Sequence, residues 1–141
     1  EEFFSALVTH LAESLGVSYA FVDKIADGAG ETVETIALYA NGEIVRNIEY
    51  DLVGTPCENV VGRDMCCYVD KIQQQFPTDD LLAQMGAESY AGIPLWTGEG
   101  KPLGLIAVMD TAPLRRFRDG DIGLLLGNGR EPSLHLVLFE C

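Results

Sequence analysis

Residues 86–110 read GAESYAGIPLWTGEGKPLGLIAVMD, and this stretch decides the fold class. Two apolar runs, Ser89–Trp96 and Leu103–Asp110, flank the polar segment TGEGKP at residues 97–102. Apolar runs of strand length on either side of a short polar turn are typical of an antiparallel β-hairpin. Gly86, just before the hairpin, is expected to end a helix. The stretch therefore predicts neighbouring antiparallel strands in an α+β domain.

The sequence before the hairpin first predicts one helix and then three strands. Val17–Ile25 is rich in β-branched and aromatic residues. Asn41-Gly42 joins two further runs, Thr32–Ala40 and Glu43–Tyr50, and favours a type I′ turn in which both residues have positive φ. The opening helix is indicated by apolar residues that fall on one helical face, namely Phe4, Leu7, Val8, Leu11 and Leu15.

A long connection with few periodic signals, Asp51–Arg63, leads from these strands toward the hairpin. Loops of this length in a compact domain are often functional. Met65–Val69 is expected to be a short strand and Lys71–Phe76 a helical turn. Thr78 is expected to cap the next helix, which would bury Leu81, Leu82 and Met85. After the hairpin, Asp119–Leu126 is expected to begin a last helix.

Composition and charge exclude several classes of partner. The chain has 141 residues, of which 48% are hydrophobic, so a single globular domain is expected. The net charge of −13 disfavours nucleic acid and anionic membrane surfaces as partners. No apolar run approaches the roughly 20 residues of a membrane span. The four cysteines form no zinc-binding pattern, so we expect reduced thiols in a cytoplasmic protein. We also expect the sequence to be a domain cut from a longer chain.

Signatures of catalysis are missing from the sequence. It contains no G-x-S-x-G nucleophile elbow and no phosphate-binding glycine loop before a helix. Only two histidines, His10 and His135, are available to activate a nucleophile. No recognised catalytic motif is therefore found in the sequence.

Several phrases in this order resemble a GAF domain, of the sensory subtype found in bacterial sensor histidine kinases and diguanylate cyclases. They are LGV with YAFV at residues 15–22, EYDL with GTPCENV at 49–60, Phe76-Pro77, GAESY at 86–90, GIPL at 92–95 and PLGLIAV at 102–108. The resemblance covers residues 1–126, and residues 127–141 are expected to form an atypical tail. Gly127, Gly129 and Pro132 rule out the long continuous helix that usually ends such domains.

The resemblance implies an antiparallel sheet of six strands in the order 3-2-1-6-5-4. Terminal helices would cover one face, and the loop and short helices before the hairpin would cover the other. Relatives hold small ligands under that second layer, so the Asp51–Arg63 loop is expected to be a pocket wall. The candidate ligand-binding residues combine aromatic rings with a carboxylate and a thiol: Tyr50, Cys57, Tyr68, Phe76, Glu88 and Tyr90.

The leading hypothesis is thus a non-catalytic sensory domain that binds an unknown small molecule and relays the signal to a fused output domain. A structural dimerisation module without a ligand is the first alternative, because Phe4, Leu7 and Leu11 suit a homodimer as well as packing within the chain. A thiol-dependent free methionine sulfoxide reductase that uses Cys57, Cys66 and Cys67 is the second. Bilin-binding relatives attach pigment through a Cys followed by His, whereas here Cys66 precedes Cys67. The resemblance therefore names no cofactor and no metal.

Overall fold

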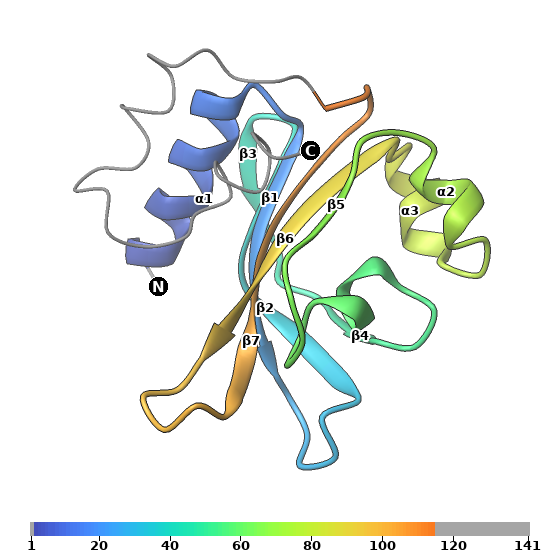
Figure 1. The fold of residues 1–141 in the computed structure, drawn as a ribbon. Coiled ribbons are helices and arrows are strands. Elements are labelled where there is room, and N and C mark those ends of the chain that lie inside the picture. The colour runs from blue at the N-terminus through green and yellow to red at the C-terminus, as the bar shows by residue number, and fades with distance from the viewer. Residues whose placement is uncertain (1, 115–141) are drawn as a thin grey trace.

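The computed structural model describes residues 2–114 and shows an α+β domain built on one twisted antiparallel sheet (Figure 1). Helix α1 lies against one face of the sheet, and a layer of loops and short helices lies against the other. The helical elements are α1 (Glu2–Leu15), the 3-10 turn η1 (Pro56–Asn59), α2 (Ile72–Gln75) and α3 (Asp80–Met85). The strands are β1 (Tyr19–Ile25), β2 (Thr32–Ala40), β3 (Glu43–Val45), β4 (Glu49–Asp51), β5 (Cys66–Tyr68), β6 (Ser89–Trp96) and β7 (Pro102–Asp110).

The strand order is β3-β2-β1-β7-β6-β5, with β4 also paired to β2. This confirms the expected order 3-2-1-6-5-4, because β3 and β4 are two pieces of the single strand expected over Glu43–Tyr50. The division occurs opposite Thr35. Its hydroxyl donates to Asn47 Oδ1 at 2.8 Å and accepts from the Ile48 N–H at 2.9 Å, so a side chain replaces part of the regular ladder.

The hairpin that the sequence predicts is present; β7 pairs with β1 in the middle of the sheet, and β6 lies between β7 and β5. Strands β6 and β7 pair from Ser89 opposite Asp110 to Trp96 opposite Pro102. The turn between β2 and β3 is also as expected, with φ of 51° at Asn41 and 98° at Gly42. Both hairpins therefore follow from local turn chemistry.

A close approach of two backbones fixes the middle of the sheet at Gly104. A Cβ atom at this position would lie 1.9 Å from the main-chain oxygen of Asp23. The pairing of β1 with β2 shifts register between Val22 and Asp23, at the same level of the sheet. Glycine in a strand commonly marks such an approach, and here it allows β7 to lie directly against β1.

The two faces of β1 belong to two separate hydrophobic clusters. Ala20 and Val22 pack with α1, whose buried residues are Val8, Ala12 and Leu15, and Phe4, Leu7 and Leu11 are partly buried in the same cluster. Tyr19 and Phe21 point to the opposite face and pack under the covering layer. The helix expected to begin at Asp119 falls outside the described residues.

The covering layer contains the loop after β4, the turn η1 and the helices α2 and α3. Helix α3 is capped by Asp79, whose side chain accepts from the Leu81 N–H at 3.1 Å, and not by Thr78 as the sequence suggested. Gly86, with φ of 66°, ends the helix as expected. Among residues 2–114 no helix is long and apolar enough to cross a membrane.

Candidate functional site

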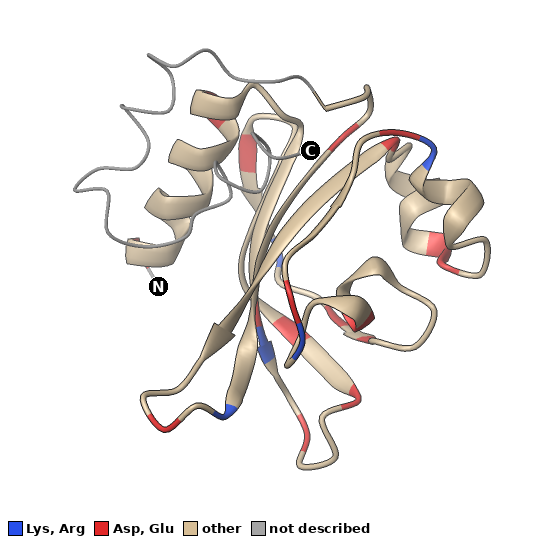
Figure 2. Ribbon diagram, viewed as in Figure 1, with Lys and Arg blue, Asp and Glu red and all other residues tan. Residues whose placement is uncertain are grey.

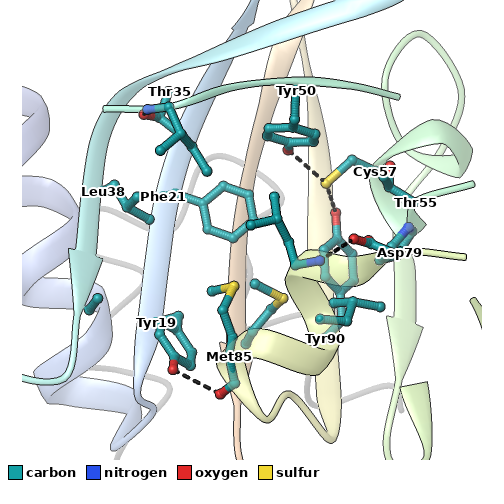
Figure 3. Close-up of a pocket in the computed structure, with 16 residues that line it drawn as sticks. Tyr19, Phe21, Thr35, Leu38, Tyr50, Thr55, Cys57, Asp79, Met85 and Tyr90 are labelled. Carbon is teal, nitrogen blue, oxygen red and sulfur yellow. Dashed lines mark hydrogen bonds between the residues drawn. The ribbon is translucent and has the colours of Figure 1, made fainter. Parts of the chain in front are cut away.

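A cavity of about 210 Å³ lies between the sheet and the covering layer (Figure 3). Its floor is formed by side chains of β1, β2, β6 and β7, including Phe21, Leu38 and Tyr90. Its walls come from β4, η1 and α3, including Pro56 and Leu82. Most of these groups are apolar, so the cavity is a hydrophobic space with polar atoms confined to a few places.

One end of the cavity is closed by a contact between the sheet and α3. The hydroxyl of Tyr19 donates to the main-chain oxygen of Met85 at 2.9 Å. Figure 3 shows this bond at the opposite end of the cavity from the thiol of Cys57. The contact holds the C-terminal end of α3 against β1 and so fixes the width of the cavity there.

A polar corner lies around the thiol of Cys57, which is 3% exposed. The hydroxyls of Tyr50 and Tyr90 both lie 3.2 Å from Cys57 Sγ. Tyr90 is completely buried, and its hydroxyl donates to the sulfur. Three elements therefore meet here, because Tyr50 belongs to β4, Cys57 to η1 and Tyr90 to β6.

The polar corner continues to the buried carboxyl group of Asp23, which is 1% exposed. Asp23 shares the cavity face of β1 with Tyr19 and Phe21, and its Oδ2 accepts a short hydrogen bond from the Tyr50 hydroxyl. Its Oδ1 has no hydrogen-bond partner, the one such buried side-chain oxygen or nitrogen within residues 2–114. An unpaired buried carboxylate oxygen is costly, so this atom calls for a functional explanation.

The number of available protons decides which group donates in each hydrogen bond of this network. A tyrosine hydroxyl carries one proton, so Tyr50 cannot donate to Asp23 and to Cys57 at the same time. When Asp23 is ionised it accepts a hydrogen bond from the Tyr50 hydroxyl. The 3.2 Å contact between Tyr50 and Cys57 is then made by the thiol proton, so the deduced order of donation is Tyr90 to Cys57, Cys57 to Tyr50, and Tyr50 to Asp23. The chain of donors ends on a single carboxyl group.

Burial controls the protonation states of the network. Desolvation raises the pKa of Asp23 to about 7, although the hydrogen bond from Tyr50 opposes the shift. Desolvation, with the nearby Asp23 charge, raises the pKa of Cys57 to about 12. The pKa values of Tyr50 and Tyr90 rise well above their usual value, mainly through burial. Near neutral pH only Asp23 changes its charge within this group.

A second carboxyl group, that of Asp79, lines the cavity directly. It is half-buried at the start of α3, and burial raises its pKa although the backbone N–H groups of Leu82 and Leu81 oppose the shift. In the part of the chain that the structure describes, no Lys, Arg or His lines the cavity. Figure 2 shows the positions of Lys and Arg at a few points on the described ribbon, among more positions of Asp and Glu.

The structure brings together three of the six residues that the sequence singled out. Tyr50, Cys57 and Tyr90 line the cavity. Tyr68 and Phe76 pack beside it, with ring centroids 5.3 Å apart, but do not line it.

Glu88 has a structural role in place of the expected position in the cavity. Its Oε1 accepts from the Lys71 N–H at 2.9 Å, and its main-chain oxygen accepts from the Ile72 N–H at 3.0 Å. These bonds secure the start of α2, where Lys71 has φ of 56°. The carboxylate near the cavity floor is therefore Asp23 and not Glu88.

Sequence reasoning missed Asp23, although a signal was available. Tyr19, Phe21 and Ile25 alternate on one face of a strand, and Asp23 is the polar residue that interrupts this face. Asp79, which lines the cavity, was also not among the candidate ligand-binding residues. The expectation of reduced thiols holds for Cys57 and Cys66, which are free, and fails for Cys67, which is disulfide-bonded.

Comparisons with known proteins agree with the fold. The GAF domain family model matches residues 1–127. A search of curated proteins found no significant match. Among solved structures, a domain of a two-component sensor histidine kinase from Sinorhizobium meliloti is 18% identical, with a TM-score of 0.58 over 96% of this chain and 87% of that chain.

Two further solved structures show how varied the similar proteins are. The red/green cyanobacteriochrome NpR6012g4 is 20% identical, with a TM-score of 0.65 over 99% of this chain and 93% of that chain. A free methionine-R-sulfoxide reductase from Thermoplasma acidophilum is 17% identical, with a TM-score of 0.60 over 99% of this chain and 92% of that chain. At such identities these structures establish the fold alone. With the family match over most of the sequence, they show that the chain belongs to the GAF domain family.

Proposed function

We propose that this GAF domain is a non-catalytic sensor that binds a small molecule in the cavity between its sheet and its covering layer. The observation that carries the proposal is the cavity itself, a mostly apolar space of about 210 Å³ with one convergent polar corner at Tyr50, Cys57 and Tyr90. An apolar pocket with a few fixed polar groups is the usual form of a small-molecule site.

The volume sets the size of the ligand. An engineered apolar cavity of about 150 Å³ is known to bind benzene. A space of about 210 Å³ therefore suits a molecule with one ring and a short substituent. The cavity has no built-in cofactor in this proposal.

The position of the cavity suggests how binding is transmitted. Its walls belong to β4, which pairs with β2, and to η1 and α3 of the covering layer, all of which are short elements. A ligand that contacts both the walls and the sheet stabilises one arrangement of this layer over others. A fused output domain of histidine kinase or diguanylate cyclase type would respond to that shift. The sequence of the complete gene tests this part, because a gene without an output domain would contradict it.

The alternative of a thiol-dependent reductase is disfavoured by the state of the thiols. A reactive cysteine is partly exposed and has a lowered pKa. Cys57 is buried with a pKa of about 12, and burial also raises the pKa of Cys66. Reduction of free methionine sulfoxide by the purified protein, abolished when Cys57, Cys66 and Cys67 are substituted together, would overturn the non-catalytic assignment.

The alternative of a ligand-free dimerisation module predicts a different result. Phe3 on α1 is 70% exposed, so an apolar side chain is available for association. Analytical ultracentrifugation gives the oligomeric state, and a stable homodimer that no compound stabilises against heat would favour this alternative. The cytoplasmic location and the exclusion of nucleic acid and membrane surfaces remain predictions from the sequence.

A thermal-shift screen of small metabolites, run on two variants, tests the proposal. The A40F variant places a ring on a cavity-lining position at the end of β2. The A6F variant makes the same substitution on the exposed face of α1 and serves as the control. Compounds that stabilise the native protein and A6F but not A40F support binding in the cavity. If no compound stabilises the native protein, or if A40F responds equally, the proposal fails.

A further inference from the structure

The cavity has an electrostatic character that narrows the class of ligand. One carboxyl group, Asp79, lies in its wall, and a second, Asp23, is hydrogen-bonded to the lining residue Tyr50. Within residues 2–114, no basic side chain lines the cavity to balance these charges. Charges act strongly in a poorly hydrated space, so the interior favours a cation and disfavours an anion.

The hydrogen bonds of the polar corner point the same way. The hydroxyls of Tyr50 and Tyr90 donate within the network, and Cys57 completes it, so these groups have no free proton for a ligand acceptor. What remains unsatisfied is an acceptor, Oδ1 of Asp23. Asp79 accepts from the backbone N–H groups of Leu81 and Leu82, and a carboxylate has further acceptor sites beyond these two bonds. The unsatisfied groups of the site are therefore hydrogen-bond acceptors, which suit a ligand that carries a hydrogen-bond donor.

We propose that the ligand of this cavity is a small, mostly apolar molecule that carries a protonated amino group. The ammonium group provides hydrogen-bond donors and a positive charge that complement the carboxyl groups of Asp79 and Asp23. The apolar body of the ligand fills the space over Phe21 and Leu38. Asp79 lines the cavity and is reached directly, whereas Asp23 does not line it and acts on the ligand through its charge from behind the lining residue Tyr50. This inference rests on the proposed small-molecule function and specifies its ligand class.

Four probes of similar size separate the charge preference from binding as such: toluene, benzyl alcohol, benzylamine and benzoate. Dissociation constants are measured by calorimetry at pH 8, where benzylamine, like a lysine amine, is protonated. We expect benzylamine to bind at least tenfold more tightly than benzyl alcohol, and benzoate to bind most weakly. Equal or tighter binding of benzyl alcohol or benzoate overturns the inference and leaves the proposed function standing. If none of the four binds, the proposed function fails and the inference fails with it.

Variants assign the preference to named residues. D79N removes the charge in the wall and keeps a side chain that caps helices well. D23N removes the buried charge. D80N is the control, because Asp80 is exposed, follows Asp79 in the sequence and does not line the cavity. The ratio of benzylamine to benzyl alcohol affinity should fall at least threefold in D79N and in D23N and stay unchanged in D80N. An affinity ratio that is unchanged in both D79N and D23N contradicts the assignment.

Discussion

The phenol of Tyr50 on β4 donates a hydrogen bond to the buried carboxyl group of Asp23 on β1, although β2 pairs with both strands and lies between them. The bond crosses the cavity face of the sheet and joins its central strand to the beginning of the covering loop. Because Tyr50 also contacts Cys57 in η1, one side chain links the sheet, the loop and the polar corner. The stability of the free protein and its response to a ligand should therefore both depend on this tyrosine.

Removing the Tyr50 hydroxyl should destabilise the domain. In Y50F the second oxygen of Asp23 also loses its partner, and loss of a hydrogen bond to a buried polar group costs about 1–3 kcal/mol. Urea unfolding at pH 8 measures this loss. The matched control is Y68F, which removes a half-buried hydroxyl that accepts from Asn59 Nδ2 at 3.1 Å. An equal loss of unfolding free energy in Y50F and Y68F would show that the Tyr50–Asp23 bond stabilises the domain no more than the Asn59–Tyr68 bond does.

Stability should fall as the pH rises from about 4 to about 7. The pKa of Asp23 is about 7 in the folded protein against 3.8 for an ordinary aspartate. Between these values the folded state binds more protons than the unfolded state, so raising the pH favours unfolding, by up to roughly 4 kcal/mol for this group alone. Below both values the group contributes no penalty.

The D23N variant isolates this effect from other carboxylates. The amide that replaces the carboxyl group cannot ionise, so the stability of D23N relative to the native protein should improve as the pH rises from 4 to 8. This buried amide leaves a donor unpaired, which makes the variant the less stable of the two at pH 4. Urea midpoints at several pH values give the trend, with D80N as a control for loss of an exposed charge. A difference between D23N and the native protein that does not change with pH would show that Asp23 does not titrate in this range.

A single methyl group at Gly104 should damage the centre of the sheet. In G104A the new Cβ would lie 1.9 Å from the Asp23 main-chain oxygen, and neither backbone can move without breaking the pairing of β1 with β7. Overpacking typically costs about 1–3 kcal/mol and occasionally more, and a clash with backbone belongs at the upper end of this range. The control is G98A in the β6–β7 turn, where a Cβ meets nothing within 4 Å. Thermal melts of both variants make the comparison, and similar melting temperatures would contradict the described approach.

The thiol of Cys57 should be protected from alkylation in the native protein. Its burial and its pKa of about 12 keep it in the unreactive thiol form at pH 8. Iodoacetamide labelling followed by mass spectrometry should modify Cys57 only after denaturation. Rapid native labelling at Cys57 would indicate an exposed or activated thiol and would revive the reductase alternative.

The sequence was sufficient for the fold because its signals are local. The Asn41-Gly42 turn, the Gly86 helix end and the alternating runs of the hairpin each act within a few residues, and all three are confirmed. The split of the expected strand after Val45 was not predictable in this way. It depends on Thr35, twelve residues before Asn47 in the sequence, whose side chain replaces the ladder there.

The candidate site was only half predictable for the same reason. Tyr50, Cys57 and Tyr90 were chosen as residue types that suit a pocket, and the structure places them together. Glu88 was chosen on the same grounds, but its carboxylate is satisfied by the Lys71 N–H. Whether a carboxyl group is buried and unpaired, as in Asp23, depends on contacts between strands far apart in the sequence. Only the folded arrangement shows this.

Binding of a small molecule between the sheet and the covering layer is tested most directly by titration followed by ¹H–¹⁵N NMR. Benzylamine is added to labelled protein, and the amide shifts are mapped onto the structure. We expect saturable shifts centred on Phe21, Thr35, Cys57 and Leu82, which line the cavity, and none at these positions in A40F. Shifts that do not saturate, or that centre on α1 and the opposite face of the sheet, would contradict binding in the cavity.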